Sequence, residues 1–290
     1  MSHASKPAVP AAPEPNKSRA GRNLPQAIGV GVGMGGVVIC SLIFSPAVFV
    51  GVVAVAVLIA LWEFSNALAT TGVRVPVVPI AIGTTAMLVA GYEAGTESLM
   101  VGLLLTVLGV IGWRLAEGPD GFVRDVTAGV FTCVYLPFLA GFAVLMASAP
   151  NDGAERVATF IILVVCNDVG GFAAGVMFGK HPMAPRISPK KSWEGMAGSL
   201  LTCAVGGAVC MATLMDDAAW KGVFLGLALA VAATVGDLGE SVLKRDIGVK
   251  DMGNLLPGHG GIMDRLDSLL IAAPIAWLLL SWMVDPTPFL

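Results

Sequence analysis

One stretch near the C-terminus contains most of the residues that could carry out chemistry. Carboxylates, basic side chains, a histidine and glycines are clustered there. Asp237 and Lys244 are seven residues apart, so they share one face near the end of a predicted helix. Asp264 and Asp267 share a face at the start of the next helix. Carboxylates on two helices suit a divalent cation that holds a polyphosphate. The alternative is that Asp237 and Asp264 only form ion pairs with Lys244 or Arg265.

The segment between these two helices contains clustered glycines and a proline. These residues prevent a regular helix and let backbone N–H groups approach a ligand closely. His259 has glycine on both sides, and we expect it to bind phosphate or to position Asp251 rather than to ligate a metal. Arg245 is rotated by about 100° from the face of Lys244, and we expect it to pair with Asp251 or with lipid headgroups.

A second basic segment precedes another predicted helix. Lys190 and Lys191 follow Pro189, and Ser192 comes next. A Pro-Lys-Lys-Ser turn that opens a helix offers ammonium groups and helix N-terminal amides, which together form an anion site. The alternative is that these lysines only set the orientation of the chain in a membrane.

Ionisable residues also occur inside long apolar runs, where each costs roughly 2.5–3.5 kcal/mol on insertion scales. These residues are Glu63, Asp168, Asp237 and Glu240. Asp168 lies about 16 Å from the end of its predicted helix, and together with Asp237 it implies a polar cavity. The alternative is that Asp168 only pairs with one of the lysines of the basic segment. We interpret Glu63 as a structural partner for Asn66 or for a neighbouring helix.

The composition predicts a membrane protein. The chain has 290 residues, of which 56% are hydrophobic and 13% charged, and its mean hydropathy is +0.83. A soluble domain has about 25% charged residues. The five cysteines lack metal-ligand spacing and are typical of small buried hydrophobic residues.

The apolar runs predict an all-α, polytopic transmembrane bundle of about nine spanning helices. Their expected ranges are 24–44, 46–68, 76–92, 97–115, 124–148, 155–179, 195–215, 219–246 and 262–284. Residues 1–23 form a polar, Pro- and Ala-rich tail that we expect to be disordered. Residues 24–290 then form one transmembrane domain, with its catalytic half at about 155–284.

The distribution of basic residues predicts the orientation. With a cytoplasmic N-terminus, 15 of the 17 lysines and arginines fall on the inside, and only Arg156 and Lys221 fall outside. This arrangement places both basic segments on the cytoplasmic face of a bacterial-type cytoplasmic (inner) membrane.

The C-terminal stretch also carries an extended motif. It reads Ser241-x-Leu243-Lys244-Arg245, Lys250-Asp251-x-Gly253, Leu255, His259-Gly260-Gly261 and Asp264-Arg265-Leu266-Asp267. This pattern resembles the signature of phosphatidate cytidylyltransferases. The basic segment is similar to the SPKK[ST]xEG segment of the same family, with serine at position 192.

The resemblance implies that CTP and phosphatidic acid give CDP-diacylglycerol and pyrophosphate with Mg²⁺, and the carboxylates are numerous enough for a second metal ion. It also implies a homodimer. The expected catalytic residues are Asp237, Asp264, Asp267 and Lys244, and the expected metal ligands are Asp237 and Asp264. The expected substrate-binding residues are Asp168, Ser188, Lys190, Lys191, Ser192, Ser241, Arg245, Lys250, Asp251, His259, Gly260, Gly261 and Arg265.

Two other functions remain open from the residues alone. A cation- or proton-coupled transporter would use Asp168, Asp237 and Asp264 as ion sites along a path. A CTP-dependent lipid kinase would share the substrates but transfer a phosphoryl group. No nucleic-acid partner is expected.

Overall fold

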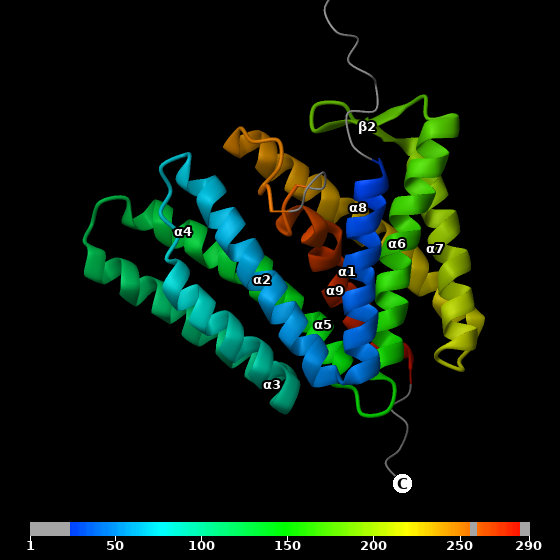
Figure 1. Cartoon of the computed structure of the whole chain (residues 1–290), viewed down its shortest axis with the longest axis horizontal. Helices are drawn as coiled ribbons and strands as arrows, with labels where there is room; N and C mark the ends of the chain where they lie inside the picture. The colour runs from blue at the N-terminus through cyan, green and yellow to red at the C-terminus, as the bar shows by residue number, and fades with distance from the viewer. Residues whose placement is uncertain (1–23, 256–259, 285–290) are drawn as a thin grey trace, which may run out of the picture.

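The computed structural model describes residues 24–255 and 260–284, with side chains from residue 33 onward. The described chain is a bundle of helices with one two-stranded hairpin (Figure 1). The predicted tail at residues 1–23 lies outside the described residues. The elements are α1 (Leu24–Phe44), α2 (Pro46–Ala69), α3 (Val77–Glu117), α4 (Phe122–Cys133), the π-helix η1 (Val134–Phe138), α5 (Leu139–Ala147), α6 (Gly153–Phe178), β1 (Pro182–Ala184), β2 (Ser188–Ser192), α7 (Trp193–Thr213), α8 (Ala219–Ile247) and α9 (Met263–Met283).

The prediction of nine spanning helices is not matched. Within the described residues, seven helices are long and apolar enough to cross a membrane. One difference lies in α1, whose side chains are described only from Gly33, so that its described apolar stretch is Gly33–Phe44. The other lies in the predicted spans 76–92 and 97–115, which both fall within the 41 residues of α3 and are counted there as one helix, although the helix is interrupted at Gly95.

Helix α3 departs from helical geometry at Gly95, where φ is 77°. Glycine takes this left-handed conformation without a steric cost. On either side of it the chain packs against itself, because Gly83 lies against Thr106 and Gly102 against Met87. The two arms are therefore antiparallel. A straight helix of this length would extend about 60 Å, roughly twice the thickness of a bilayer core.

The predicted span 124–148 corresponds to α4, η1 and α5, which follow one another without a break. Pro137 lies inside η1. Proline has no N–H to donate to the preceding turn, so the wider π turn occurs where a regular helical hydrogen bond is missing.

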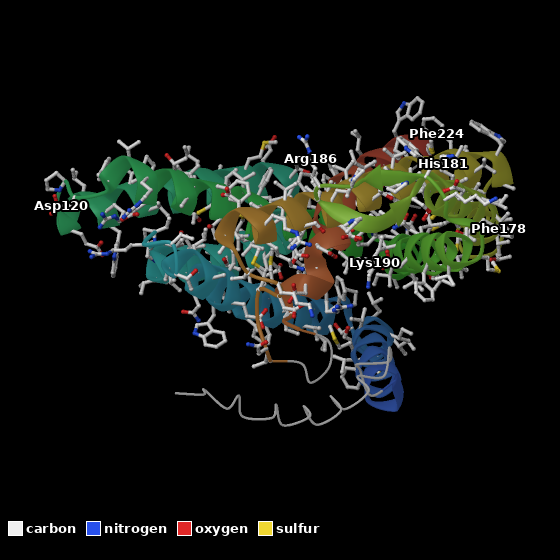
Figure 2. The ribbon with its side chains drawn as sticks, turned by 90° about the horizontal axis from the view of Figure 1, so that it is seen from above. Asp120, Phe178, His181, Arg186, Lys190 and Phe224 are labelled. Atoms are coloured by element: carbon white, nitrogen blue, oxygen red, sulfur yellow. The ribbon has the colours of Figure 1, made fainter. Side chains whose placement is uncertain are left out.

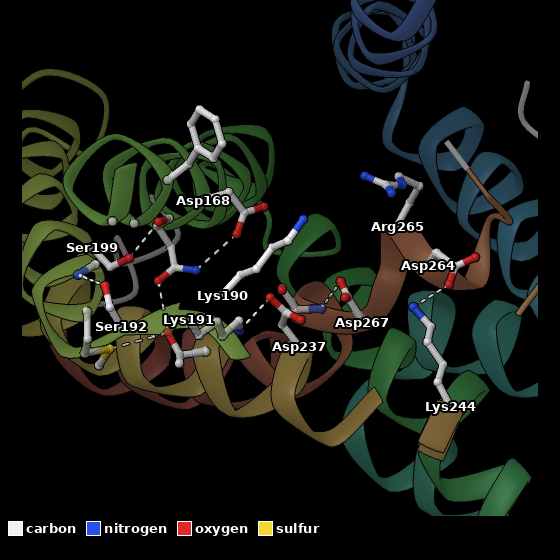
Figure 3. Close-up of a pocket in the computed structure, with 18 of the residues that line it drawn as sticks. Asp168, Lys190, Lys191, Ser192, Ser199, Asp237, Lys244, Asp264, Arg265 and Asp267 are labelled. Carbon is white, nitrogen blue, oxygen red and sulfur yellow. Dashed lines mark hydrogen bonds and ion pairs between the residues drawn. The ribbon is translucent and has the colours of Figure 1, made fainter. Parts of the chain in front are cut away.

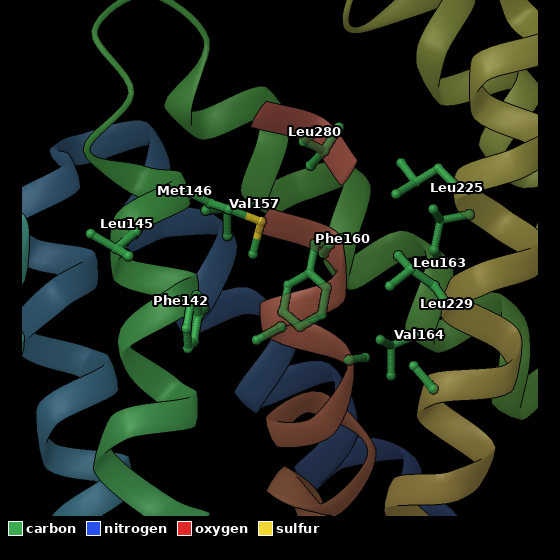
Figure 4. Packing of buried hydrophobic residues seen from close by; sticks show 14 of the residues in the cluster. Phe142, Leu145, Met146, Val157, Phe160, Leu163, Val164, Leu225, Leu229 and Leu280 are labelled. Carbon is green, nitrogen blue, oxygen red and sulfur yellow. The ribbon is translucent and has the colours of Figure 1, made fainter. Parts of the chain in front are cut away.

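The apolar core lies between α5, α6, α8 and α9 (Figure 4). Phe142 of α5, Leu163 of α6, Leu229 of α8 and Leu280 of α9 all belong to this buried cluster. The Phe142 ring also packs against Trp277, with ring centroids 5.3 Å apart. Burial of such side chains fixes α6, α8 and α9 relative to one another, and these are helices that carry the predicted site.

The basic segment differs from its prediction. Residues Ser188–Ser192 form strand β2, paired antiparallel with β1, instead of a turn. The expected helix does begin directly afterwards, at Trp193. The Ser192 side chain caps it, accepting a hydrogen bond from the Gly195 N–H at 3.1 Å. Glu194 holds the hairpin against α7, because its carboxylate accepts the backbone N–H groups of Lys180 and His181.

Figure 1 shows that the hairpin, the end of α8 and the start of α9 lie at the same upper end of the bundle. The start of α1 and the end of α2 also lie there, whereas α9 ends at the opposite side. The two basic segments of the sequence are therefore neighbours in space.

Candidate active site

A cavity of about 450 Å³ opens between α6, β2, α7, α8 and α9 (Figure 3). Every described residue that lines it lies between positions 167 and 268. Ten of the predicted site residues line this cavity: Asp168, Lys190, Lys191, Ser192, Asp237, Lys244, Asp251, Asp264, Arg265 and Asp267. The fold thus brings the two basic segments and the aspartates to one place.

Lys191 and Asp237 form the ion pair that joins the hairpin to α8. The Lys191 Nζ atom lies 2.5 Å from Asp237 Oδ2, and the two side chains keep 23% and 37% of their exposure. Pairing of Asp168 with Lys190 or Lys191 was the alternative to a role at the site, and the ion pair of Lys191 is with Asp237. Asp168 instead accepts a hydrogen bond from the Asn167 side chain at 3.1 Å.

Lys244 forms a second, more buried ion-pair cluster. Its Nζ atom lies 2.5 Å from Asp264 Oδ1 and 2.7 Å from Glu240 Oε2. Asp264 also accepts the backbone N–H of Gly261 at 2.7 Å and that of Met252 at 3.2 Å. Ion pairing of Asp264 with Lys244, the alternative considered above, is therefore present. Lys244 reaches Asp264 rather than the Asp237 carboxylate with which it shares a helix face.

Three carboxylates from different helices face the cavity. Asp168 of α6, Asp237 of α8 and Asp267 of α9 interact electrostatically with one another. Asp267 is oriented by the Ser268 N–H, which donates to its Oδ1 atom at 2.6 Å. Carboxylate oxygens are the ligands that Mg²⁺ prefers, so the donor set fits this ion in its chemistry. Within the described residues, however, no three Asp, Glu, His or Cys side chains are gathered into one metal-binding group.

The cations lie on several sides of the same cavity. Lys190 and Lys191 come from β2, Lys244 from α8 and Arg265 from α9. Figure 3 shows Lys190 extending into the space between the Asp168 and Arg265 side chains. Phosphate groups carry several negative charges, so a cavity with cations on opposite walls can hold a polyphosphate and a second phosphate together.

Several predicted residues lie away from the cavity lining. These are Ser188, Ser241, Arg245, Lys250, Gly260 and Gly261. Arg245 contacts the hairpin instead, where its Nε atom donates to the Ile187 carbonyl at 3.4 Å. Gly261 contributes its N–H to Asp264, so it acts on the cavity wall indirectly. His259 lies outside the described residues.

Three residues that the sequence did not single out complete the polar wall: Asn167, Ser199 and Thr234. Ser199 donates to the Asn167 carbonyl at 2.7 Å, and Thr234 donates to its side-chain oxygen at 3.4 Å. Helical spacing could have found Thr234, which precedes Asp237 by three residues and so lies on the same face of α8. Ser199 carries no such signal, because small hydroxyl residues are common in membrane helices.

A model of the cytidylyltransferase family matches residues 25–283. The chain belongs to this family. It is 43% identical over 283 residues to the phosphatidate cytidylyltransferase of Mycobacterium leprae, covering 92% of this chain and 90% of that protein. It is 42% identical to the Mycobacterium tuberculosis H37Rv protein of the same name, covering 93% and 86% of the two chains. For the Helicobacter pylori phosphatidate cytidylyltransferase, 42% identity extends over 48% of this chain and 53% of that protein.

Proposed function

We propose that this protein transfers the cytidylyl group of CTP to phosphatidic acid and releases pyrophosphate. The observation that carries this proposal is the single cavity in which Lys190 and Lys191 of the hairpin meet the aspartates of α8 and α9. The described part of the chain contains seven apolar helices long enough to span a membrane, so a lipid can approach the cavity from the bilayer and a nucleotide from water. The family, and the phosphatidate cytidylyltransferases among the relatives, support the same reaction.

In this reaction, an oxygen of the lipid phosphate attacks the α-phosphorus of CTP. The bond from that phosphorus to the oxygen of the β-phosphate breaks, and pyrophosphate leaves. The attacking oxygen is already anionic, so no strong general base is needed. The main barrier is the repulsion between two anions, and fixed cations lower it by neutralising charge and aligning the reactants. Lys190, Lys191 and Arg265 are placed to do this.

Lys191 and Lys244 are held by carboxylates before any substrate binds. Lys191 can exchange Asp237 for a phosphate oxygen, because this ion pair is partly exposed. Lys244 is more enclosed, and Glu240 and Asp264 fix its position. The start of α7 adds its N-terminal amides, which favour an anion, although the Gly195 N–H is already bonded to Ser192.

The same proposal includes Mg²⁺, held by Asp237 and Asp264 with Asp267 beside them. Bound there, the ion would neutralise phosphate charge, and the carboxylates are numerous enough for a second ion. To serve as ligands, Asp264 must exchange its contact with Lys244 and Asp237 must exchange its contact with Lys191.

We further propose that the cavity faces the cytoplasm of a bacterial inner membrane and that the N-terminus lies on the same side. Fifteen of the 17 basic residues support this orientation. The start of α1 and the hairpin lie at one end of the bundle (Figure 1), which agrees with a common side. A homodimer, implied by the family resemblance, and the absence of a nucleic-acid substrate belong to the same proposal.

Purified protein with Mg²⁺, CTP and phosphatidic acid provides the test. Release of pyrophosphate together with CDP-diacylglycerol supports the proposal. Release of CDP identifies a CTP-dependent lipid kinase. Release of neither pyrophosphate nor CDP favours the cation- or proton-coupled transporter. Light scattering on the detergent-solubilised protein measures the oligomeric state in the same preparation.

A further inference from the structure

Glu63 is a buried carboxylate in the last two turns of α2, outside the cavity described above. Its side chain is 1% exposed. Burial of an ionisable group in a membrane helix is costly and calls for a partner or a purpose. The partner expected from the sequence was Asn66 or a neighbouring helix, and the structure shows contacts with α9 and the segment that precedes it.

The Glu63 carboxylate accepts hydrogen bonds from the beginning of α9. Its Oε2 atom accepts the Met263 N–H at 2.9 Å, although the two residues are 200 positions apart. The Ile262 N–H also interacts with this carboxylate. The first N–H groups of a helix have no partner within the helix, and a negative charge at this end is favourable. Glu63 therefore anchors the N-terminus of α9 from another helix.

The segment before α9 also closes around Glu63. The three atoms nearest to a Cβ built at Gly253 all belong to the Glu63 side chain, and the same holds at Gly261. In both cases the added atom would overlap the carboxyl group. Neither glycine has a positive φ, so backbone conformation alone does not require glycine there. The close approach of the Glu63 carboxylate explains both residues.

Glu63 and Asp264 both accept backbone N–H groups from the start of α9 and from the residues that precede it. Glu63 accepts from Met263, while Asp264 accepts from Gly261 and Met252. Asp264 in turn contacts Lys244 at 2.5 Å. A shift of the α9 N-terminus would therefore move Asp264 and Asp267 together relative to α8.

We propose that Glu63 is a positioning residue for the reaction. It fixes the start of α9 against α2 through Met263, Gly253 and Gly261, and so holds Asp264 and Asp267 in place relative to α8. It does not touch the substrates. Only the measurement of kcat rests on the proposed function. The anchoring of the α9 N-terminus can be measured by hydrogen exchange, without turnover.

The first experiment compares Glu63→Ala with Glu63→Gln in the full-length protein. Alanine removes the acceptor, and we expect kcat per folded molecule to fall on the order of 100-fold, as misplacement of reacting groups by about 1 Å does. Glutamine keeps an oxygen that accepts the Met263 N–H, so it should restore most of the activity. Hydrogen exchange of the peptide containing residues 260–266 should become faster in the alanine variant and stay slow in the glutamine variant.

Asp125→Ala is the matched control, because Asp125 is a fully buried carboxylate that pairs with Arg114 and Arg124 away from the cavity. It should lower thermal stability without changing kcat per folded molecule or exchange at residues 260–266. If Glu63→Ala keeps wild-type kcat and slow exchange, Glu63 does not position α9. The same conclusion follows if Glu63→Gln loses as much activity as Glu63→Ala.

A double-mutant cycle tests the steric part. Gly261→Ala should impair the wild-type protein, since its Cβ displaces the Glu63 carboxylate, but add little in the Glu63→Ala background. Additive losses would overturn the proposed contact. A wild-type protein that makes no CDP-diacylglycerol would refute the proposed function, whereas the exchange measurements would still decide the role of Glu63.

Discussion

The Nζ atom of Lys191 lies 2.5 Å from the Oδ2 atom of Asp237 and links strand β2 to helix α8 across the cavity. The pair brings together the two segments of the sequence that carry most of the expected chemistry. Both side chains are partly exposed to the cavity, so each can be released to a ligand. The two charges offset each other at the cavity wall, and their separation would make a cation available to phosphate and an anion available to a metal ion.

We expect Asp237→Asn to lower kcat by about two orders of magnitude or more, because it removes a carboxylate from the proposed metal site. The protein should still insert and purify normally, since Asp237 is partly exposed and its loss buries no unpaired charge. Steady-state kinetics across a Mg²⁺ titration is the measurement. Near-wild-type activity at saturating Mg²⁺ would remove Asp237 from the metal site.

Asp264→Asn should lower both activity and stability, unlike Asp237→Asn. Asp264 is 6% exposed and contacts Lys244 and two backbone N–H groups. The substitution leaves Lys244 with one charged partner instead of two, and loss of a buried charge-assisted hydrogen bond costs about 1.5–3 kcal/mol. Thermal unfolding in detergent, run beside the Asp237 variant, measures the difference. Equal unfolding temperatures would show that the Lys244 contact contributes nothing to stability.

Lys190→Ala, Lys191→Ala and Lys244→Ala should each impair catalysis more than Arg186→Ala. All four changes remove one positive charge, but only the lysines line the cavity. Figure 2 shows Lys190 and Arg186 projecting from opposite sides of the hairpin. KM for CTP and for phosphatidic acid should be measured separately, after membrane insertion has been checked. An equal loss for Arg186→Ala would mean that the hairpin acts only through its general positive potential.

Labelling of single cysteines tests the proposed orientation. After the native cysteines are replaced, a cysteine at Asp152, just before α6, should react with an impermeant thiol reagent added to intact cells. One at Met183, in β1, should react only after the cells are opened. The basic residues predict this difference, because the hairpin lies on their side of the membrane. The reverse pattern would place the cavity on the side without CTP.

The sequence by itself determined the class of the protein and most of the cavity residues. Hydrophobic runs of membrane length require helices, because backbone groups in lipid must bond within their own segment. Helical spacing placed Asp237 and Lys244 on one face and Asp264 and Asp267 on another. These are local properties, so they can be read without knowing which helices are neighbours. The motif added the family, which the comparisons confirmed.

Only the tertiary structure decided which partners these residues have. Lys191 pairs with Asp237 and not with Asp168, and Lys244 pairs with Asp264 across two helices. The left-handed backbone at Gly95 folds α3 into two antiparallel arms, one for each of two predicted spans. The contact between Glu63 and Met263 joins positions 200 residues apart. Hydropathy and spacing describe each helix alone, whereas such contacts depend on how helices pack, and packing is set by the side chains of all neighbouring elements together.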